Sequence, residues 1–206
     1  MTTPVRLIHI GKCGGMTVSS LLILRGIKHK AIHLRKPIFD RTHKYIILIR
    51  NPNQRFISAF NWRYKLVIAD KAQENKFIGE KEILKKYRTV SNLAADISNF
   101  DINKTYIHHI KENINFYLGD FLTHCKKENI IGIITTENFD CDMEQIYGKG
   151  ITHNIHIHNN KSNGNCELSD EEKANLKSYL HEDYECINKL YEMGCLTQLQ
   201  FNNLSQ

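Results

Sequence analysis

Residues 9–17 combine side chains and glycines suited to binding a phosphate group. This segment reads His-Ile-Gly-Lys-Cys-Gly-Gly-Met-Thr and follows a short apolar run. Gly14 and Gly15 permit close approach of the backbone to a ligand, Lys12 adds a positive charge, and Thr17 adds a hydroxyl group. If the segment joins a strand to a helix, backbone N–H groups and the positive end of the helix dipole face the same small volume. The segment therefore predicts a phosphate-binding turn.

A second candidate anion site follows the apolar run Tyr45–Ile49. Arg50 comes directly after this run, Pro52 suits the first turn of a following helix, and Ser58 lies about two turns into that helix. A guanidinium group donates two parallel hydrogen bonds to a phosphate, and a hydroxyl group adds a third. The alternative is that Arg50 forms an ion pair at the strand end while Ser58 faces solvent.

Alternating strand and helix patterns indicate how these side chains are positioned. The patterns predict a three-layer, P-loop-like α/β domain, in which helices flank a mainly parallel central sheet. Ligands of such sheets bind beyond the carboxyl ends of the strands, so the ends at Ile10 and Arg50 are expected to converge. We expect one domain over 1–206, with a mostly helical segment at about 66–127. Strands are predicted at 5–10, 30–34, 45–49 and 130–135, and helices at 17–25, 52–64, 80–87, 90–97, 114–125, 142–147 and, as one long helix, 169–194.

Composition excludes several classes of protein. The chain has 206 residues, a net charge of +6 and 41% hydrophobic residues, and no apolar run long enough to span a membrane. Lysines and arginines are scattered, so no nucleic-acid partner is expected. The first residues do not resemble a secretory signal, and the six cysteines form no Cys-x-x-Cys pair, which favours a cytoplasmic protein with reduced thiols. His153, His156 and His158 lack regularly spaced acidic or cysteine partners, so no metal is expected.

Read together, the two anion-binding segments resemble the carbohydrate-type (heparan-sulfate-type) sulfotransferases. The first is similar to that family's His-Ile-Pro-Lys-Thr-Gly-Gly-Thr-Ser element, and the second to its Arg-Asp/Asn-Pro-x-x-Arg-x-x-Ser element. A third segment, His-Asn-Asn-Lys-Ser at 158–162, resembles the family's closing loop; residues 65–127 carry little of the likeness. The resemblance implies that 3′-phosphoadenosine 5′-phosphosulfate (PAPS) is the sulfuryl donor, 3′-phosphoadenosine 5′-phosphate (PAP) the product, and no metal is required. The implied donor-binding residues are Gly11, Lys12, Cys13, Gly14, Gly15, Met16, Thr17, Arg50, Ser58, Asn160, Lys161 and Ser162.

The first segment departs from the family pattern at three positions. Gly11 replaces a proline, and Cys13 and Met16 replace threonines. The backbone N–H donors survive these changes, but two hydroxyl groups do not, so phosphate contacts are expected from Thr17 and the main chain. Cys13 is not expected to be a nucleophile, because the direct in-line transfer that the family uses needs no covalent enzyme intermediate.

Sulfuryl transfer to an acceptor hydroxyl, for example of a saccharide, requires a cation at the leaving phosphate and a general base. Lys12 is the expected cation. His33, at the end of the second predicted strand, is the expected base and also an acceptor-binding residue, whereas His9 is expected to be a buried core residue. Competing candidates for the base are His29, His43, His108, His109 and Glu137. The acceptor cleft is predicted to include Trp62, Arg63 and Tyr64; alternatively, Tyr64 packs inward and the other two are solvated.

Two other functions stay open at this point. A P-loop kinase for a small molecule or nucleotide requires a lysine after the last glycine and a strand-end aspartate for Mg²⁺. Here Lys12 precedes the glycine pair, and the predicted strand 130–135 runs into Thr136-Glu137. A non-catalytic nucleotide-binding module of the same fold is the second alternative, since two hydroxyl groups of the family pattern are missing.

Overall fold

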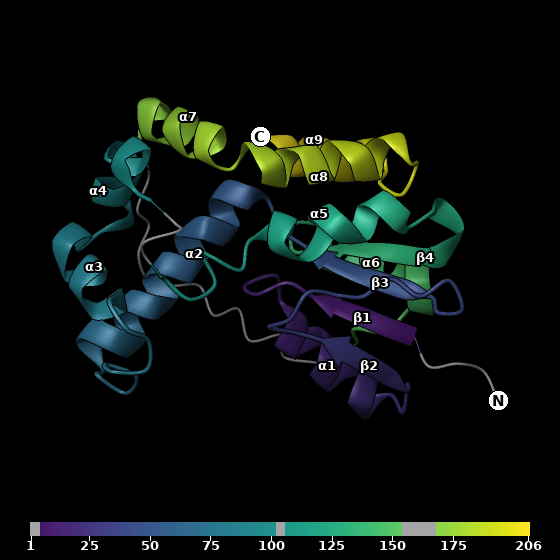
Figure 1. The fold of residues 1–206 in the computed structure, drawn as a ribbon. Coiled ribbons are helices and arrows are strands. Elements are labelled where there is room, and N and C mark those ends of the chain that lie inside the picture. Colours follow the sequence, from purple (N-terminus) through teal and green to yellow (C-terminus); the bar gives the residue numbers. More distant parts are fainter. Residues whose placement is uncertain (1–4, 102–105, 154–167) are drawn as a thin grey trace. The chain divides into compact units, whose positions relative to one another are not determined.

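The computed structural model describes residues 5–101, 106–153 and 168–206. It shows an α/β fold with a four-stranded, all-parallel sheet flanked by helices (Figure 1). The chain divides into two compact units, which are described separately below. The first unit comprises Met1–Asn51, Asn113–Asn159 and Glu182–Gln206, and the second comprises Pro52–Glu112 and Asn160–His181.

The sheet lies in the first unit and has the strand order β2-β1-β3-β4. Ile8 of β1 is paired with Ile32 of β2 on one side and with Ile47 of β3 on the other. Every residue of β3 is buried, as expected for a β-branched strand covered on both faces. The four strands are β1 (Val5–His9), β2 (His29–Ile32), β3 (Tyr45–Ile49) and β4 (Ile130–Thr135).

This strand order places a change of direction between β1 and β3. From β1 the chain passes through α1 (Gly15–Leu24) to β2 on one side, whereas β3 pairs with the opposite side of β1. In parallel sheets, ligands bind outside the carboxyl ends of the strands at such a point. The segments that follow β1 and β3 are the two that the sequence singled out.

Helices cover both faces of the sheet. In Figure 1, α1 lies on one face, and α5 (Ile114–His124) and α8 (His181–Glu192) lie on the other. Val18, Leu21 and Leu22 of α1 are fully buried. α6 (Phe139–Tyr147) packs so closely on β4 that a Cβ atom at Gly132 would lie 2.6 Å from Ile146.

The described residues of the second unit form helices joined by loops. Pro52 begins α2, as its fixed φ angle predicts, and Ser169 and Glu172 form the predicted capping box of α7. The helices of the second unit begin at residue 52, whereas the helical segment was expected from about residue 66. They are α2 (Pro52–Tyr64), a π-helical turn (Lys65–Ala69), α3 (Glu80–Tyr87), α4 (Val90–Ala95), a 3₁₀ turn (Ile97–Asn99) and α7 (Asp170–Tyr179).

The long helix predicted over 169–194 is wrong, because the chain forms two helices with Leu180 between them. α7 packs against α4 in the second unit, whereas α8 belongs to the first unit, where Asp183 accepts a hydrogen bond of 2.8 Å from the Asn115 N–H. Both halves bury apolar residues at helical spacing, so the pattern alone does not reveal the break. A further helix, α9 (Gln198–Ser205), was not predicted, although Thr197 and Gln200 form its capping box. Among the described residues, no helix is both long and apolar enough to cross a bilayer.

Candidate functional site

The turn between β1 and α1 has the geometry of an anion-binding loop. Lys12 and Gly14 both have left-handed backbone angles, with φ of 71° and 77°, and this reverses the chain within five residues. Gly14 occupies the N-cap position of α1, where it offers no side chain to accept hydrogen bonds from the helix, and the first turn holds no acidic residue. The first N–H groups of a helix have no partner within it. The amides of Gly15, Met16 and Thr17 therefore present hydrogen-bond donors and the positive end of the helix dipole at this end of α1.

The ring of His9 lies between Gly15 of this turn and the ring of His33, which follows β2. A Cβ atom at Gly15 would lie only 1.9 Å from Cδ2 of His9, so only glycine fits at the first position of α1. The ring of His9 in turn stacks on that of His33, with centroids 4.0 Å apart and planes 17° apart. Burial, and secondarily the charge of His33, lower the pKa of His9 to about 4. His9 is thus a neutral, half-buried spacer at neutral pH rather than the fully buried core residue expected.

The hydrogen bonding of His33 fixes its tautomer. Its Nδ1 lies 2.8 Å from the carbonyl oxygen of His9. A carbonyl oxygen only accepts hydrogen bonds, so Nδ1 carries the proton and Nε2 carries the lone pair of the neutral ring. The structure therefore holds His33 directly after β2, at the same sheet edge as the turn, in the tautomer that a general base needs.

Lys12 and Arg50 lie close enough to repel each other. Burial, followed by the positive charge of Arg50, lowers the pKa of Lys12 from 10.5 to about 8, against a smaller opposing effect of Cys13. Arg50 is half-buried and makes no hydrogen bond or ion pair with a protein group in the part of the chain that the structure describes. Two like charges held at adjacent strand ends cost free energy unless an anion binds between or beside them. This arrangement favours the anion-binding interpretation of Arg50 over the ion-pair alternative.

A carboxylate completes this edge of the sheet on the other side of Arg50. Oε1 of Glu137, after β4, accepts a hydrogen bond of 3.0 Å from the backbone N–H of Asn51. Desolvation raises the pKa of Glu137, although this hydrogen bond and the charge of Arg50 oppose the increase. Asn51 also donates from Nδ2 to the carbonyl oxygens of Leu204 and Gln206, at 3.1 and 3.0 Å. The end of β3 is thus fixed by both the β4 loop and α9.

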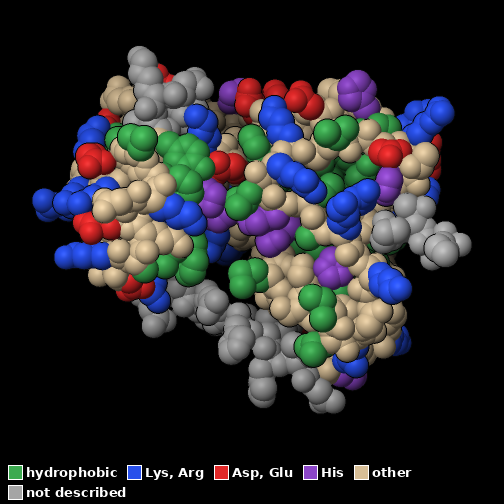
Figure 2. Space-filling model, turned by 60° about the horizontal axis from the view of Figure 1, so that its bottom comes forward, with side chains coloured by type: hydrophobic (Ala, Val, Ile, Leu, Met, Phe, Trp, Pro, Cys, Tyr) green, Lys and Arg blue, Asp and Glu red, His purple; other side chains and the backbone are tan. Residues whose placement is uncertain are grey.

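Side chains of the turn divide into those that face the protein and those that face solvent. Cys13 is 2% exposed, and its thiol donates to the carbonyl oxygen of Gly11 at 3.8 Å, which suits a structural thiol. Met16 is 80% exposed, so most of its side chain lies in solvent. Thr17 is half-buried and is the one hydroxyl-bearing residue of the first helical turn. Apolar side chains elsewhere also reach the surface between basic ones (Figure 2).

The residues of α2 that were predicted to bind donor or acceptor lie in the second unit, and one of them, Arg63, is buried instead. Arg63 was expected to line an acceptor cleft or to be solvated, but it is 1% exposed and is held by Glu80, through bonds of 2.9 Å from Nε and 2.6 Å from Nη2. Its guanidinium therefore has no exposed surface for an acceptor, because it neutralises a buried carboxylate. Tyr64 is half-buried and stacks on Phe60 at 6.2 Å, whereas Trp62 is 40% exposed. Ser58, also half-buried, lies on the same helix.

The predicted closing loop lies outside the described residues. This applies to Asn160, Lys161 and Ser162 and to two of the three histidines, at positions 156 and 158. The turn before it is described: Arg25, one residue beyond α1, donates to the carbonyl oxygens of Gly150, Ile151 and His153 at 2.9–3.3 Å.

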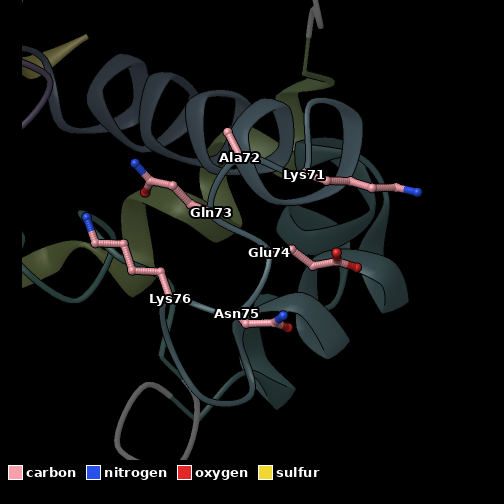
Figure 3. A pocket seen from close by; sticks show the side chains of 6 residues that line it. All are labelled: Lys71, Ala72, Gln73, Glu74, Asn75 and Lys76. Carbon is pink, nitrogen blue, oxygen red and sulfur yellow. The ribbon is translucent and has the colours of Figure 1, made fainter.

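The second unit contains two other features that could form a site, a pocket and a cluster of side chains. A shallow pocket is lined by the consecutive residues 71–76, but Figure 3 shows Lys71 and Glu74 pointing to one side and Gln73 and Lys76 to the other. These side chains do not converge on a ligand. Sequence reasoning also missed a cluster formed by His108, His109 and Glu112. Its signal in the sequence is the pattern His-His-x-x-Glu at 108–112.

Comparison with known proteins gives no match. No protein-family model, curated protein or solved structure is significantly similar to this chain.

Proposed function

We propose that the chain is a sulfotransferase that moves a sulfuryl group from PAPS to an acceptor hydroxyl by direct in-line transfer. The observation that carries the proposal is the pair of cations at the carboxyl ends of β1 and β3. Lys12 and Arg50 follow two adjacent parallel strands, and the charge of Arg50 contributes to a pKa of about 8 at Lys12. The resemblance of both segments to the sulfotransferase motifs supports the same assignment.

The residues of the β1–α1 turn fit the 5′-phosphosulfate end of PAPS. An uncapped helix N-terminus supplies backbone donors, and Lys12 supplies the positive charge. In the three-layer, P-loop-like domain that we propose, such a turn joins the first strand to the first helix. Lys12 is followed by Cys13 and not by the Ser/Thr whose hydroxyl binds Mg²⁺ in a Walker A loop, and this difference favours a donor that binds without Mg²⁺.

In this proposal Lys12 and His33 perform the chemistry. The acceptor oxygen forms a bond to sulfur while the bond from sulfur to the 5′-phosphate oxygen breaks, and PAP leaves with the bonding electron pair. Lys12 stabilises the negative charge that develops on that oxygen. Nε2 of His33 takes the proton of the acceptor hydroxyl, while the hydrogen bond from Nδ1 to the His9 carbonyl keeps the ring in position.

The remaining assignments extend the proposal from the resemblance. By the resemblance alone, Arg50 is proposed to bind the 3′-phosphate, and Ser58, Asn160, Lys161 and Ser162 are proposed as further donor-binding residues. Trp62 and Tyr64 contribute to the acceptor site, for which a small molecule or a saccharide is the proposed occupant. Arg63 is left out of this set because its side chain is buried against Glu80.

Calorimetry with PAP tests the proposal against its rivals. We expect PAP to bind the wild-type chain without metal, and more tightly than ATP with Mg²⁺. Arg50→Ala should weaken PAP binding by tenfold or more, because charge-assisted hydrogen bonds are worth about 1.5–3 kcal/mol. Arg35→Ala is the matched control, since Arg35 is exposed and lies in the same unit.

Each outcome separates the three candidate functions. Preference for ATP with Mg²⁺ would identify a kinase and refute the sulfotransferase. Tight PAP binding with no sulfuryl transfer to any of a panel of hydroxyl acceptors would favour a non-catalytic module. Equal losses in the Arg50 and Arg35 variants would refute the proposed anion site.

A further inference from the structure

Three side chains of the second unit are arranged as a set of metal ligands. His108, His109 and Glu112 each place a ligand atom within 4.8 Å of the other two. Both histidines are 9% exposed, and Nδ1 of His108 lies 3.2 Å from Oε2 of Glu112. Imidazole nitrogens and a carboxylate oxygen are the donors that Zn²⁺ commonly takes. We propose that this cluster binds one Zn²⁺ ion, independently of the proposed nucleotide site.

The spacing of the ligand atoms suits a four-coordinate ion. Bonds of about 2.0–2.2 Å to a tetrahedral zinc ion place its ligand atoms about 3.4 Å apart. The distance between His108 and Glu112 is already close to this value. The rings of His108 and His109 stack with centroids 3.9 Å apart and planes 30° apart, so their edges run side by side. One of the two rings must rotate out of this stack before the in-plane lone pairs of both rings and the carboxylate oxygen point at one ion.

The backbone of both histidines is held in place by buried charged groups. The N–H of His108 donates to Oε1 of Glu80 at 2.8 Å, and Nη1 of Arg55 donates to the carbonyl oxygen of His109 at 2.7 Å. His109 has a left-handed backbone, with φ of 67°, which costs about 1–2 kcal/mol for a residue with a Cβ atom. These contacts keep the two rings adjacent despite that cost. Metal sites depend on such orientation of their ligands.

Glu112 is oriented in the same way. Its Oε1 accepts a hydrogen bond of 2.6 Å from the hydroxyl of Tyr106, and its Oε2 accepts one of 2.8 Å from the backbone N–H of His109. Ligating carboxylates in metal sites are commonly hydrogen-bonded in this manner. Phe77 lies 4.8 Å from the ring of His108 and adds an apolar wall. The three proposed ligands are therefore themselves held by neighbouring hydrogen-bonding and apolar groups.

Zinc binding displaces the proton from Nδ1 of His108. In the metal-free protein, the His108 Nδ1–H group faces Glu112. On binding, Nδ1 and Oε2 each form a bond to Zn²⁺; the proton leaves Nδ1, and the neutral ring of the ligand carries its one proton on Nε2. A fourth position is left for water or another ligand. A hydrogen-bonded cluster with no affinity for metal is the competing explanation, and it predicts no stoichiometric binding.

The full chain, stripped with a chelator and titrated with ZnCl₂ in a calorimeter, tests this inference. We expect a site that is lost in His108→Ala and weakened in Glu112→Gln by more than roughly 100-fold, the upper limit for loss of an outer partner. His124→Gln is the matched control, because His124 is exposed at the end of α5. X-ray absorption of the zinc complex should show imidazole and oxygen donors and no sulfur.

The controls keep each outcome decisive. Circular dichroism of the metal-free variants reports folding; should His108→Ala fail to fold, Glu112→Gln and the absorption spectrum decide. Zinc should raise the melting temperature of the wild type but not that of Glu112→Gln. Absence of stoichiometric binding, equal affinity in wild type and Glu112→Gln, or sulfur in the coordination shell would each overturn the assignment. None of these results depends on PAP binding.

Discussion

Replacing Gly15 by alanine tests the stack that joins the β1–α1 turn to His33. The new Cβ atom would lie 1.9, 2.1 and 2.3 Å from Cδ2, Nε2 and Cγ of His9, where contact requires about 3.5 Å or more. The ring of His9 must therefore shift, although His33 stacks on it. Overpacking of this kind costs typically 1–3 kcal/mol, and the upper end applies at such short distances. Alanine is favoured over glycine in a helix by about 1 kcal/mol, so we expect a net loss near 2 kcal/mol.

Thermal and urea unfolding, followed by circular dichroism, measure this loss. A loss near 2 kcal/mol lowers the melting temperature of a chain this long by about 4–8 °C. Combining the change with His9→Ala removes the clash, so a double-mutant cycle should return a coupling energy of about 1–3 kcal/mol. Gly14→Ala is the control, since its Cβ meets nothing within 4 Å and only backbone strain of about 1–2 kcal/mol applies. No coupling between Gly15→Ala and His9→Ala, or the same coupling with Gly14→Ala, would refute the stack.

Four further outcomes are expected. The pKa of Lys12 is lowered to about 8, so between pH 8 and 10.5 the unfolded chain binds more protons than the folded chain. The free energy of unfolding of the wild type, measured with urea, should therefore increase relative to that of Lys12→Met as the pH rises through this range. Because the pKa of His9 is lowered to about 4, wild type should lose stability relative to His9→Gln as the pH falls from 6.5 to 4; parallel curves would contradict this. Arg63→Ala should destabilise the protein by about 3–5 kcal/mol by leaving the Glu80 carboxylate buried without its partner, and a loss below 1 kcal/mol would contradict the buried pair. His33→Ala should abolish sulfuryl transfer and leave the dissociation constant of PAP nearly unchanged, whereas a parallel loss of PAP affinity would point to a structural role.

Local signals in the sequence were sufficient for the strands and several helix starts. The apolar run Tyr45–Ile49 predicted β3 with its observed bounds, and Pro52 marked the first residue of α2. The prediction of the second strand over 30–34 was displaced, since pairing with β1 stops at Ile32. Runs of β-branched residues and capping residues determine the secondary structure of positions close to them in the chain. They can therefore be recognised in the sequence without knowledge of the fold.

Long-range pairing could not be predicted from the sequence. Nothing near Arg63 indicates that Glu80, 17 residues away, accepts hydrogen bonds from both Nε and Nη2 of its guanidinium. The contact of Gly15 with His9 depends on how α1 lies against β1, which the glycine-rich pattern does not specify. The break at Leu180 arises because successive helices belong to different units, while the apolar spacing continues through it. These features depend on tertiary packing, which one sequence does not encode locally.

We propose that Lys12 is a partly desolvated cation that lies beside Arg50 and binds a phosphate group. NMR of ¹³C-lysine-labelled protein, with Lys12 assigned through Lys12→Arg, measures its pKa in the free chain and with saturating PAP. We predict a pKa near 8 in the free chain, a higher pKa with PAP because the phosphate stabilises the ammonium ion, and a higher pKa in free Arg50→Ala because a like charge is removed. A pKa near 10.5 in the free chain that responds to neither change would contradict the account.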